Sequence, residues 1–215
     1  MKETDKKKYL KNLKSITKFL DNNLKMKLKE IYKFIENIEV EEQVLDHFPI
    51  PSALEGKMFG YAVFSDGGCR QNPGPGAWGT MAQNAQGEVL FELSDSDNLT
   101  TNNKMELTGA IKGLEAIANY CLTRNESLEE TEFFLITDSQ YVVKGVNEWM
   151  QGWKNRGWRK SDKKEPENLK LWMKLDNLKQ RLPKLKANWV KGHSGHPQNE
   201  RCDELANICM DQLSS

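Results

Sequence analysis

The feature that most constrains this chain is a short apolar run that stops at a carboxylate. Residues 61–64 read Tyr-Ala-Val-Phe, and Ser65-Asp66-Gly67-Gly68-Cys69 follow directly. Asp and Gly both suit tight turns, so Asp66 taken alone indicates a turn after a strand. Later segments also place a carboxylate at the end of an element, and this repetition favours a functional site.

The chain has 215 residues and no net charge, but its charges are segregated along the sequence. Residues 1–33 hold eleven lysines against four acids, residues 34–57 hold one lysine against six acids, and residues 152–164 hold six basic side chains against one acid. Neutrality therefore does not exclude a nucleic-acid partner. The four cysteines have no paired spacing, and no apolar run suits a signal peptide or a membrane span. We expect a reduced, cytoplasmic protein with no membrane contact.

Residues 1–46 predict a small helical extension, and His47–Gly56 is interpreted as a linker because of its two prolines. Apolar residues recur at spacings of three and four, as in an amphipathic helix, at Leu24, Leu28, Ile31, Ile35 and Ile38. The lysines indicate a solvated helix face, with contact to nucleic acid as the alternative. The apolar seam must be covered by another surface. The extension therefore supports either self-association or an extra nucleic-acid contact. We expect residues 57–215 to form the main domain, and a shortened chain beginning near Glu55 to keep its fold and activity.

The main domain predicts an α/β fold with a mixed sheet. Residues 77–83 and 88–94 flank a short turn and, with the first strand, predict three antiparallel strands. A helix beginning near Asn103 follows, then the continuously apolar strand Phe133–Ile136, a short helix and a basic stretch. Further on, we expect a helix that ends before Pro183, a short strand at 188–190 and a final helix. The pattern favours five strands, three antiparallel and two parallel, with helices packed on them.

Four carboxylates stand out, and each also has an ordinary structural explanation. Asp138 would cap the helix that follows it, Glu106 would complete a capping box with Asn103, and Asp203 would be a solvated residue of the last helix. Asp66 and Asp138, however, both follow strands, and neighbouring strand ends are where α/β sheets build their sites.

Four like charges gathered at one place repel one another and need a cation. Carboxylate oxygens without a His or Cys cluster suit a hard ion, so we expect Mg²⁺, with Mn²⁺ as a substitute. Two such ions stabilise both oxygens of a phosphodiester displacement, and phosphoryl chemistry is therefore the favoured function. His193 lies between Gly192 and Gly195 in a loop, where it is either an ordinary surface histidine or a proton carrier.

Four motifs in order resemble those of type 1 ribonuclease H, from about Phe59 to about Cys209. They are Ser65-Asp66-Gly67-Gly68-Cys69, Thr101-Asn102-Asn103-Lys104-Met105-Glu106, Ile136-Thr137-Asp138-Ser139-Gln140 and Lys191-Gly192-His193-Ser194-Gly195-His196-Pro197-Gln198-Asn199-Glu200-Arg201-Cys202-Asp203. The resemblance implies an endoribonuclease that cuts the RNA strand of RNA/DNA hybrids. It implies that Asp66, Glu106, Asp138 and Asp203 hold two Mg²⁺ ions, that His193 assists catalysis, and that the products carry 3′-hydroxyl and 5′-phosphate ends.

The same resemblance implies contacts to the substrate. It assigns to the minor groove of the hybrid, where a 2′-hydroxyl distinguishes RNA from DNA, the residues Cys69, Asn72, Asn102, Asn103 and Gln140. It assigns Thr101 to a DNA phosphate. The basic stretch resembles the protrusion of bacterial members and supplies Trp149, Trp153, Lys154, Arg156, Arg159 and Lys160. The alternative for the tryptophans is packing in the core.

Three other functions fit the sequence less well. A 3′–5′ exonuclease of related fold carries an Asp-x-Glu pair on its first strand, whereas this chain has Asp66-Gly67-Gly68. Integrase-type relatives carry three acids and further DNA-binding domains. A catalytically silent hybrid-binding module would tolerate the loss of an acid, and all four acids are present. Residues 1–56 lack the aromatic, glycine-containing pattern of the hybrid-binding module found in longer family members.

Overall fold

The computed structural model describes residues 48–213 together with residues 11, 24, 25, 27, 28 and 31. The chain divides into two compact units, Met1–Asp46 and His47–Ser215. The described residues of the first unit are helical, and the rest of the predicted helical extension lies outside the described residues. The predicted domain bounds therefore stay a prediction. None of the helices that the structure describes is long and apolar enough to cross a membrane.

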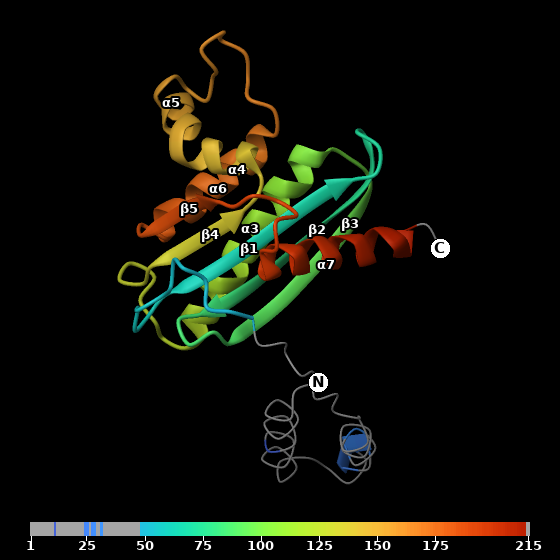
Figure 1. Cartoon of the computed structure of the whole chain (residues 1–215), viewed down its shortest axis with the longest axis vertical. Coiled ribbons are helices and arrows are strands. Elements are labelled where there is room, and N and C mark those ends of the chain that lie inside the picture. The colour runs from blue at the N-terminus through green and yellow to red at the C-terminus, as the bar shows by residue number, and fades with distance from the viewer. Residues whose placement is uncertain (1–10, 12–23, 26, 29–30, 32–47, 214–215) are drawn as a thin grey trace. The chain divides into compact units, whose positions relative to one another are not determined.

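The second unit is a five-stranded sheet with helices on both faces (Figure 1). Its strands are β1 (Tyr61–Cys69), β2 (Gly74–Asn84), β3 (Val89–Thr100), β4 (Phe133–Thr137) and β5 (Leu185–Trp189). Its helices are α3 (Asn102–Thr123), α4 (Gln140–Lys144), the π-helix η1 (Gly145–Trp149), α5 (Met150–Asn155), α6 (Leu169–Arg181) and α7 (Pro197–Leu213).

The strands lie in the order β3-β2-β1-β4-β5. β1 pairs antiparallel with β2 and parallel with β4, β2 pairs antiparallel with β3, and β4 pairs parallel with β5. The predicted mixed sheet of three antiparallel and two parallel strands is therefore confirmed. β3 runs to Thr100, beyond the predicted end at residue 94, because its pairing with β2 continues through Asp95, Ser96 and Asp97.

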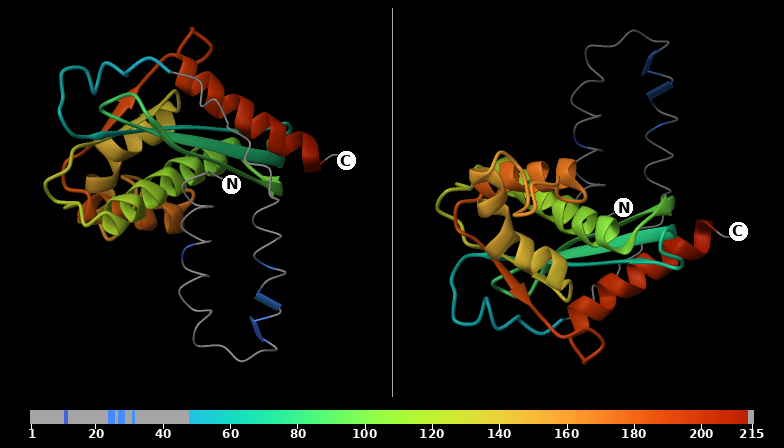
Figure 2. Two further views of the ribbon diagram at one scale, coloured as in Figure 1. Left: turned by 90° about the horizontal axis from the view of Figure 1, so that it is seen from below. Right: turned by 90° about the horizontal axis from the view of Figure 1, so that it is seen from above.

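Helices cover the two faces of the sheet unequally, as Figure 2 shows. On one face α3 packs against β1 and β2 and also contacts α6. Here the main core lies, and its largest fully buried side chains include Trp172, Phe133, Leu135, Leu114 and Ile117. On the other face α7 packs against β1, β2 and β3. The last helix thus covers a separate, smaller cluster built on Ala77, Ala206 and Met210.

The stretch Phe48–Lys57, which we call the lead-in segment, belongs to the second unit and packs against the rest of it. Its backbone turns at Pro51, whose carbonyl accepts from Leu54 N at 2.7 Å, and Leu54 is fully buried. This stretch, which the sequence predicts to be a linker, therefore makes structural contacts of its own. A chain beginning near Glu55 would lack Leu54, so the shortening that preserves these contacts begins at His47.

Candidate active site

Asp66 lies on β1 just beyond the point where β1 and β4 stop pairing. The last pair in the parallel register joins Phe64 and Ile136. β1 itself continues to Cys69 against β2, so the strand does not end at Asp66 as the sequence suggested. The parallel ladder does end there, and Asp66 and Asp138 both follow it by two residues. The predicted meeting of two carboxylates at neighbouring strand ends is thus present.

The surroundings of Asp66 raise its pKa from 3.8 to about 7. Burial of the carboxyl is the largest cause, and repulsion by Asp138 comes next. A hydrogen bond from Gly67 N, at 2.6 Å, opposes the shift, and Asp203 and Glu106 add to it. The other three carboxylates singled out in the sequence therefore all act electrostatically on Asp66.

Two glycine contacts bring the helices that carry Glu106 and Asp203 against the sheet. A Cβ on Gly67 of β1 would lie 2.5 Å from Glu106 N at the start of α3. A Cβ on Gly79 of β2 would overlap Cys202 O, next to Asp203 on α7. Neither approach leaves room for a side chain. Gly67 and Gly79 therefore allow α3 and α7, the helices that carry Glu106 and Asp203, to approach the sheet closely beside Asp66.

Glu106 is held by Ser139 and is not part of a helix cap. Thr101 is the N-cap of α3, so the predicted helix start at Asn103 is two residues late. The Glu106 carboxylate accepts from Ser139 Oγ at 2.6 Å and from Asn102 Nδ2 at 3.4 Å. Burial raises the pKa of Glu106, the Ser139 hydrogen bond opposes that shift, and Asp138 adds to it. The role of Ser139 was not predicted from the sequence, although a Ser directly after a strand-end Asp is a helix-capping signal.

Asp138 does not have the capping role that would be its ordinary explanation, and Asp203 is bonded within its own helix. The cap of α4 is Ser139, whose side chain accepts from Val142 N, so Asp138 does not cap the helix. The carbonyl of Asp138 accepts from Trp189 Nε1 at 2.9 Å, a contact that the sequence did not reveal. Asp203 is half-buried, and its Oδ1 accepts from Asn207 Nδ2 at 3.0 Å.

His193 lies in the loop between β5 and α7, and this loop touches the site. A Cβ on Gly192 would overlap Asp138 Oδ2, so the backbone next to His193 runs against that carboxylate. His193 itself is exposed and has a φ of +48°. His193 thus follows directly after Gly192, whose backbone lies against the Asp138 carboxylate, and its own imidazole is exposed.

The residue set fits a hard divalent cation. Within residues 48–213 and the few described positions before them, no three His, Cys, Asp or Glu side chains form a group that could already hold a metal ion. The carboxylates instead accept hydrogen bonds from Gly67, Ser139 and Asn207. Burial and the nearby carboxylates together raise the pKa of Asp66 to about 7, and four carboxylate ligands of this kind suit Mg²⁺ or Mn²⁺.

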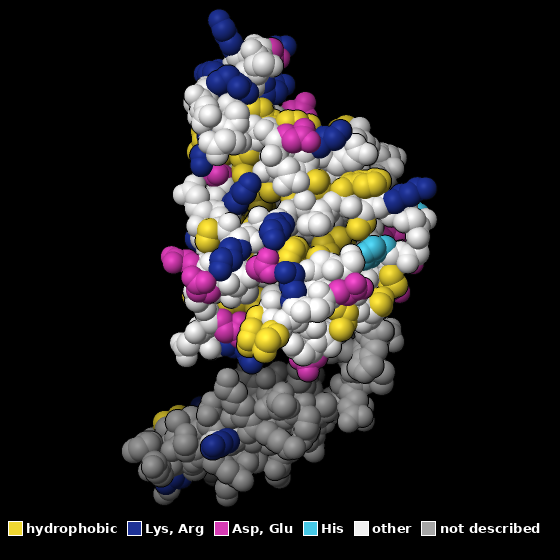
Figure 3. Space-filling view, turned by 60° about the vertical axis from the view of Figure 1, so that its left-hand side comes forward, with side chains coloured by type: hydrophobic (Ala, Val, Ile, Leu, Met, Phe, Trp, Pro, Cys, Tyr) yellow, Lys and Arg dark blue, Asp and Glu magenta, His cyan; other side chains and the backbone are white. Residues whose placement is uncertain are grey.

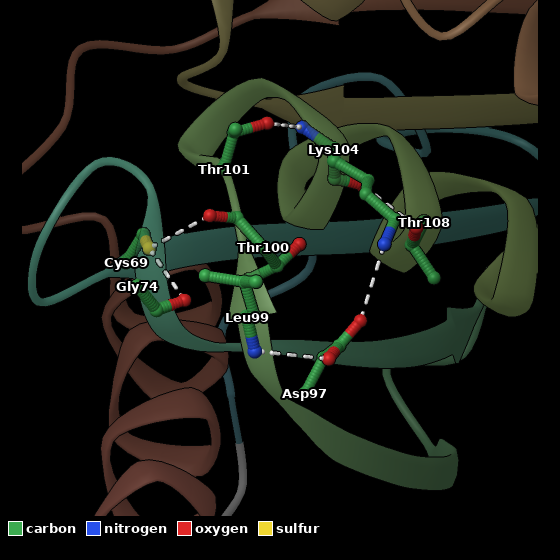
Figure 4. Close-up of polar contacts among 8 residues, drawn as sticks. All are labelled: Cys69, Gly74, Asp97, Leu99, Thr100, Thr101, Lys104 and Thr108. Atoms are coloured by element: carbon green, nitrogen blue, oxygen red, sulfur yellow. Dashed lines mark hydrogen bonds and ion pairs between the residues drawn. The ribbon is translucent and has the colours of Figure 1, made fainter.

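The predicted minor-groove residues gather beside the acids. Cys69 ends β1, and its thiol points toward the carbonyls of Gly74 and Thr100 (Figure 4). Asn72, in the turn after β1, accepts from Asn102 N at 3.3 Å. Thr101, Asn102 and Asn103 form the first turn of α3, and Gln140 is the exposed first residue of α4.

The sequence model of the ribonuclease H family ("RNase H") matches residues 59–210. This chain belongs to the ribonuclease H family. The match covers the sheet, all four carboxylates and His193, and the predicted resemblance to a type 1 ribonuclease H hydrolase is confirmed.

Curated relatives agree with the family match. The chain is 46% identical over 151 residues to "Ribonuclease H" of Dechloromonas aromatica, a match that covers 70% of this chain and 93% of the relative. It is 47% identical over 151 residues to "Ribonuclease HI" of Pseudomonas syringae pv. tomato, with 70% and 92% covered.

Solved structures show the same fold. LC11-RNase H1 in complex with RNA/DNA hybrid matches with a TM-score of 0.57 and 28% identity, covering 72% of this chain and 99% of the other. RNase H1 from the archaeon Halobacterium salinarum matches with a TM-score of 0.54 and 27% identity, covering 71% and 98%. The family match begins at residue 59, so residues 1–58 lie outside it.

The basic protrusion of this ribonuclease H differs from its predicted role at two positions. Trp153 is 8% exposed, and its ring centroid lies 5.4 Å from that of Trp172 in the core. Most of the Trp153 ring is therefore packed in the core, and its predicted contact with substrate stays a prediction. Lys154 Nζ lies 2.8 Å from Asp176 Oδ2 of α6, which neutralises its charge within the protein.

Other protrusion residues are directed outward. Arg156 and Arg159 are exposed, and Lys160 and Trp149 are half-buried. Figure 3 shows Lys and Arg side chains gathered at the end of this unit formed by α5 and the loop after it. A pocket opens there, and it is lined by Glu148, Trp149, Gly152, Trp153, Arg156, Lys160 and Ser161. Positive charge and aromatic surface are therefore available on the protrusion, separate from the carboxylates.

Removing the Asp66 charge should stabilise the folded protein in the absence of divalent ions. Because the folded carboxyl has the higher pKa, the folded state binds more protons than the unfolded state between about pH 4 and pH 7. Stability is therefore lost as pH rises through this range, and the loss is complete above pH 7. In chelator, we expect Asp66→Asn to raise the free energy of unfolding at pH 8 by on the order of 1–3 kcal/mol, and to raise it little below pH 4.

Urea denaturation of both proteins from pH 4 to pH 8 measures this difference. Asp95→Asn, at an exposed position on β3, serves as the matched control for replacing a carboxylate by an amide. A gain from Asp66→Asn that is the same at every pH would contradict the assignment.

Proposed function

We propose that this ribonuclease H is an endoribonuclease that hydrolyses the RNA strand of RNA/DNA hybrids with two divalent metal ions. The observation that carries the proposal is the electrostatic coupling of Asp66 to Asp138, Asp203 and Glu106. The similarity to LC11-RNase H1, which was solved with an RNA/DNA hybrid, supports the choice of substrate.

In this proposal Asp66, Glu106, Asp138 and Asp203 hold Mg²⁺, with Mn²⁺ as a substitute. The bound ions supply positive charge for the attacking and leaving oxygens of the phosphodiester. Asp66 is the central ligand, since the other three carboxylates all influence it. Ser139 orients Glu106 through its 2.6 Å hydrogen bond.

The reaction consumes one water molecule for each bond that is cut. Water adds to the phosphorus, the bond between phosphorus and the 3′-oxygen breaks, and the 3′-oxygen takes a proton, which leaves 3′-hydroxyl and 5′-phosphate ends. His193 carries protons at this step or assists product release, as an exposed imidazole can do near neutral pH. We assign it an assisting role because water can replace an exposed proton carrier in part.

Specificity for RNA comes, in this proposal, from the polar groups around the start of α3. Cys69, Asn72, Asn102, Asn103 and Gln140 face the minor groove, where the RNA strand displays its 2′-hydroxyls. Thr101 binds a DNA phosphate. The hydrogen bond between Asn72 and Asn102 supports this arrangement, because it holds the turn after β1 against the α3 start.

The protrusion binds the DNA strand through Arg156, Arg159 and Lys160, with Trp149 as a packing surface for a sugar. Lys154 and Trp153 act within the protein, as the Asp176 ion pair and the Trp172 contact support. For residues 1–46 we propose either self-association or an added nucleic-acid contact, which light scattering and hybrid titrations of the chain with and without them separate.

Incubation with a labelled RNA/DNA hybrid tests the proposal directly. We expect Mg²⁺-dependent cleavage of the RNA strand, and no cleavage of duplex DNA or single-stranded RNA. Asp66→Asn should lower the cleavage rate by at least about a thousandfold and keep or strengthen hybrid binding, because it removes charge from the site and preserves shape. Asp95→Asn is the matched control. Near-full activity of Asp66→Asn would sink the catalytic assignment, and hybrid binding by an inert wild-type protein would favour the silent binding module.

The protrusion is tested by its salt dependence. We expect Arg156→Gln, Arg159→Gln and Lys160→Gln together to weaken hybrid binding and to reduce the slope of log affinity against log salt by up to about three, or one for each phosphate that is no longer neutralised. The matched control replaces Arg124, at the C-terminal end of α3, and Lys184 and Lys186, at the start of β5. An unchanged slope in the protrusion variant would mean that these side chains do not touch the substrate.

A further inference from the structure

A buried hydrogen-bond network joins the lead-in segment to the first turn of α7. Gln198 is 1% exposed, and its Nε2 donates to Pro49 O at 2.6 Å and to Gln83 Oε1 at 2.8 Å. Gln83, on β2, is fully buried, and its Nε2 donates to Gly87 O at 3.0 Å and to Phe48 O at 3.4 Å. The network thus connects three segments that are far apart in the sequence, and no proposed substrate contact explains it.

Backbone carbonyls fix how both amides are turned, because a carbonyl oxygen can only accept a hydrogen bond. Pro49 O requires the NH₂ group of Gln198, and Gly87 O requires that of Gln83. The Gln83 carbonyl oxygen is then left to accept the second hydrogen of Gln198. Position 198 therefore needs a double donor, and burial prevents water from replacing a missing one.

Gln198 lies where the loop that carries His193 becomes α7. The loop also bonds to its own helix, since Gly195 N donates to Glu200 Oε1 at 3.0 Å. Because Glu200 is itself part of α7, this hydrogen bond does not connect α7 to any other element. Gln198, by contrast, attaches the junction at Pro197 to β2 and to the lead-in segment.

The other end of the loop is attached to β4. Val190 N donates to Thr137 O at 3.1 Å, and Trp189 Nε1 donates to Asp138 O at 2.9 Å. Between the two attachments, His193 adopts a φ of +48°, in the left-handed region that is uncommon for residues with a side chain. The two attachments therefore hold a loop that contains an unusual backbone conformation.

We propose that Gln198 is a positioning residue for the loop Lys191–His196, and that the lead-in segment is its anchor. Gln198 does not touch the reacting atoms; it holds the C-terminal end of the loop so that His193 stays beside Asp138. The catalytic part of this proposal rests on the proposed hydrolysis of RNA/DNA hybrids.

The test is Gln198→Met in the full chain, which keeps the length of the side chain and removes both donors. We expect kcat for hybrid cleavage to fall about five- to twentyfold with KM changed less than about twofold, because the hybrid-binding groups stay in place. Gln198→Asn, which keeps the amide on a shorter side chain, should give a smaller loss in the same direction. The matched control is Gln86→Met, which removes an exposed hydrogen bond to the carbonyl of Met58, the residue after the lead-in segment, without touching α7.

A double-mutant cycle with His193→Ala identifies the route of the effect. If Gln198 acts through His193, Gln198→Met should lower kcat by less than about twofold once the histidine is absent. If the factors by which the two single substitutions lower kcat multiply in the double variant, Gln198 acts by a route other than His193. A Gln198→Met protein that melts at a lower temperature and has wild-type kcat when folded would overturn the positioning role.

Hydrogen exchange of the loop amides provides a readout that does not need activity. We expect Gln198→Met to speed exchange in residues 191–196 at least about tenfold and Gln86→Met to leave it unchanged. Unchanged exchange in Gln198→Met would refute the anchor. An inactive wild-type protein whose loop still loosens in Gln198→Met would instead refute the proposed function and leave the anchor standing.

Discussion

Burial of Asp66 beside three other carboxylates is the constraint on which the rest of this structure depends. A buried carboxyl that faces Asp138, Asp203 and Glu106 has its pKa raised to about 7, which is unfavourable for the folded chain near neutral pH. Nothing in the packing of the sheet requires four acids there. The arrangement becomes favourable when a divalent cation occupies the site, and a site of that kind suits hydrolysis of a phosphodiester.

The fold supplies the close approach that repulsion among these carboxylates opposes. β1 lies in the middle of the sheet, with α3 and α7 on opposite faces. Gly67 lets the α3 backbone reach β1, and Gly79 lets α7 reach β2. Burial of the apolar faces of both helices stabilises these contacts, so the main core holds Glu106, and the smaller cluster holds Asp203, near Asp66 despite their like charges.

Local patterns were enough to predict the sheet and the four acids, because each acid follows a strand or lies in a recognisable motif. They failed where a long-range contact decides the outcome. Two prolines made the lead-in segment look like a linker, but Leu54 is buried, and Pro49 bonds to Gln198, 149 residues away. Trp153 was assigned to substrate, although the partner that buries it, Trp172, comes from another helix. Single-sequence patterns carry no information about such pairings.

The central claim is tested most directly by the titration of Asp66 itself. In protein labelled with ¹³C at aspartate carboxyl groups, the chemical shift of Asp66 can be followed against pH with and without Mg²⁺, and Asp66→Asn identifies its signal. The account predicts a midpoint near pH 7 in chelator and a clear fall of that midpoint when Mg²⁺ is added, since a cation favours the charged form. A midpoint near 4 in chelator, or one that Mg²⁺ does not move, would contradict it.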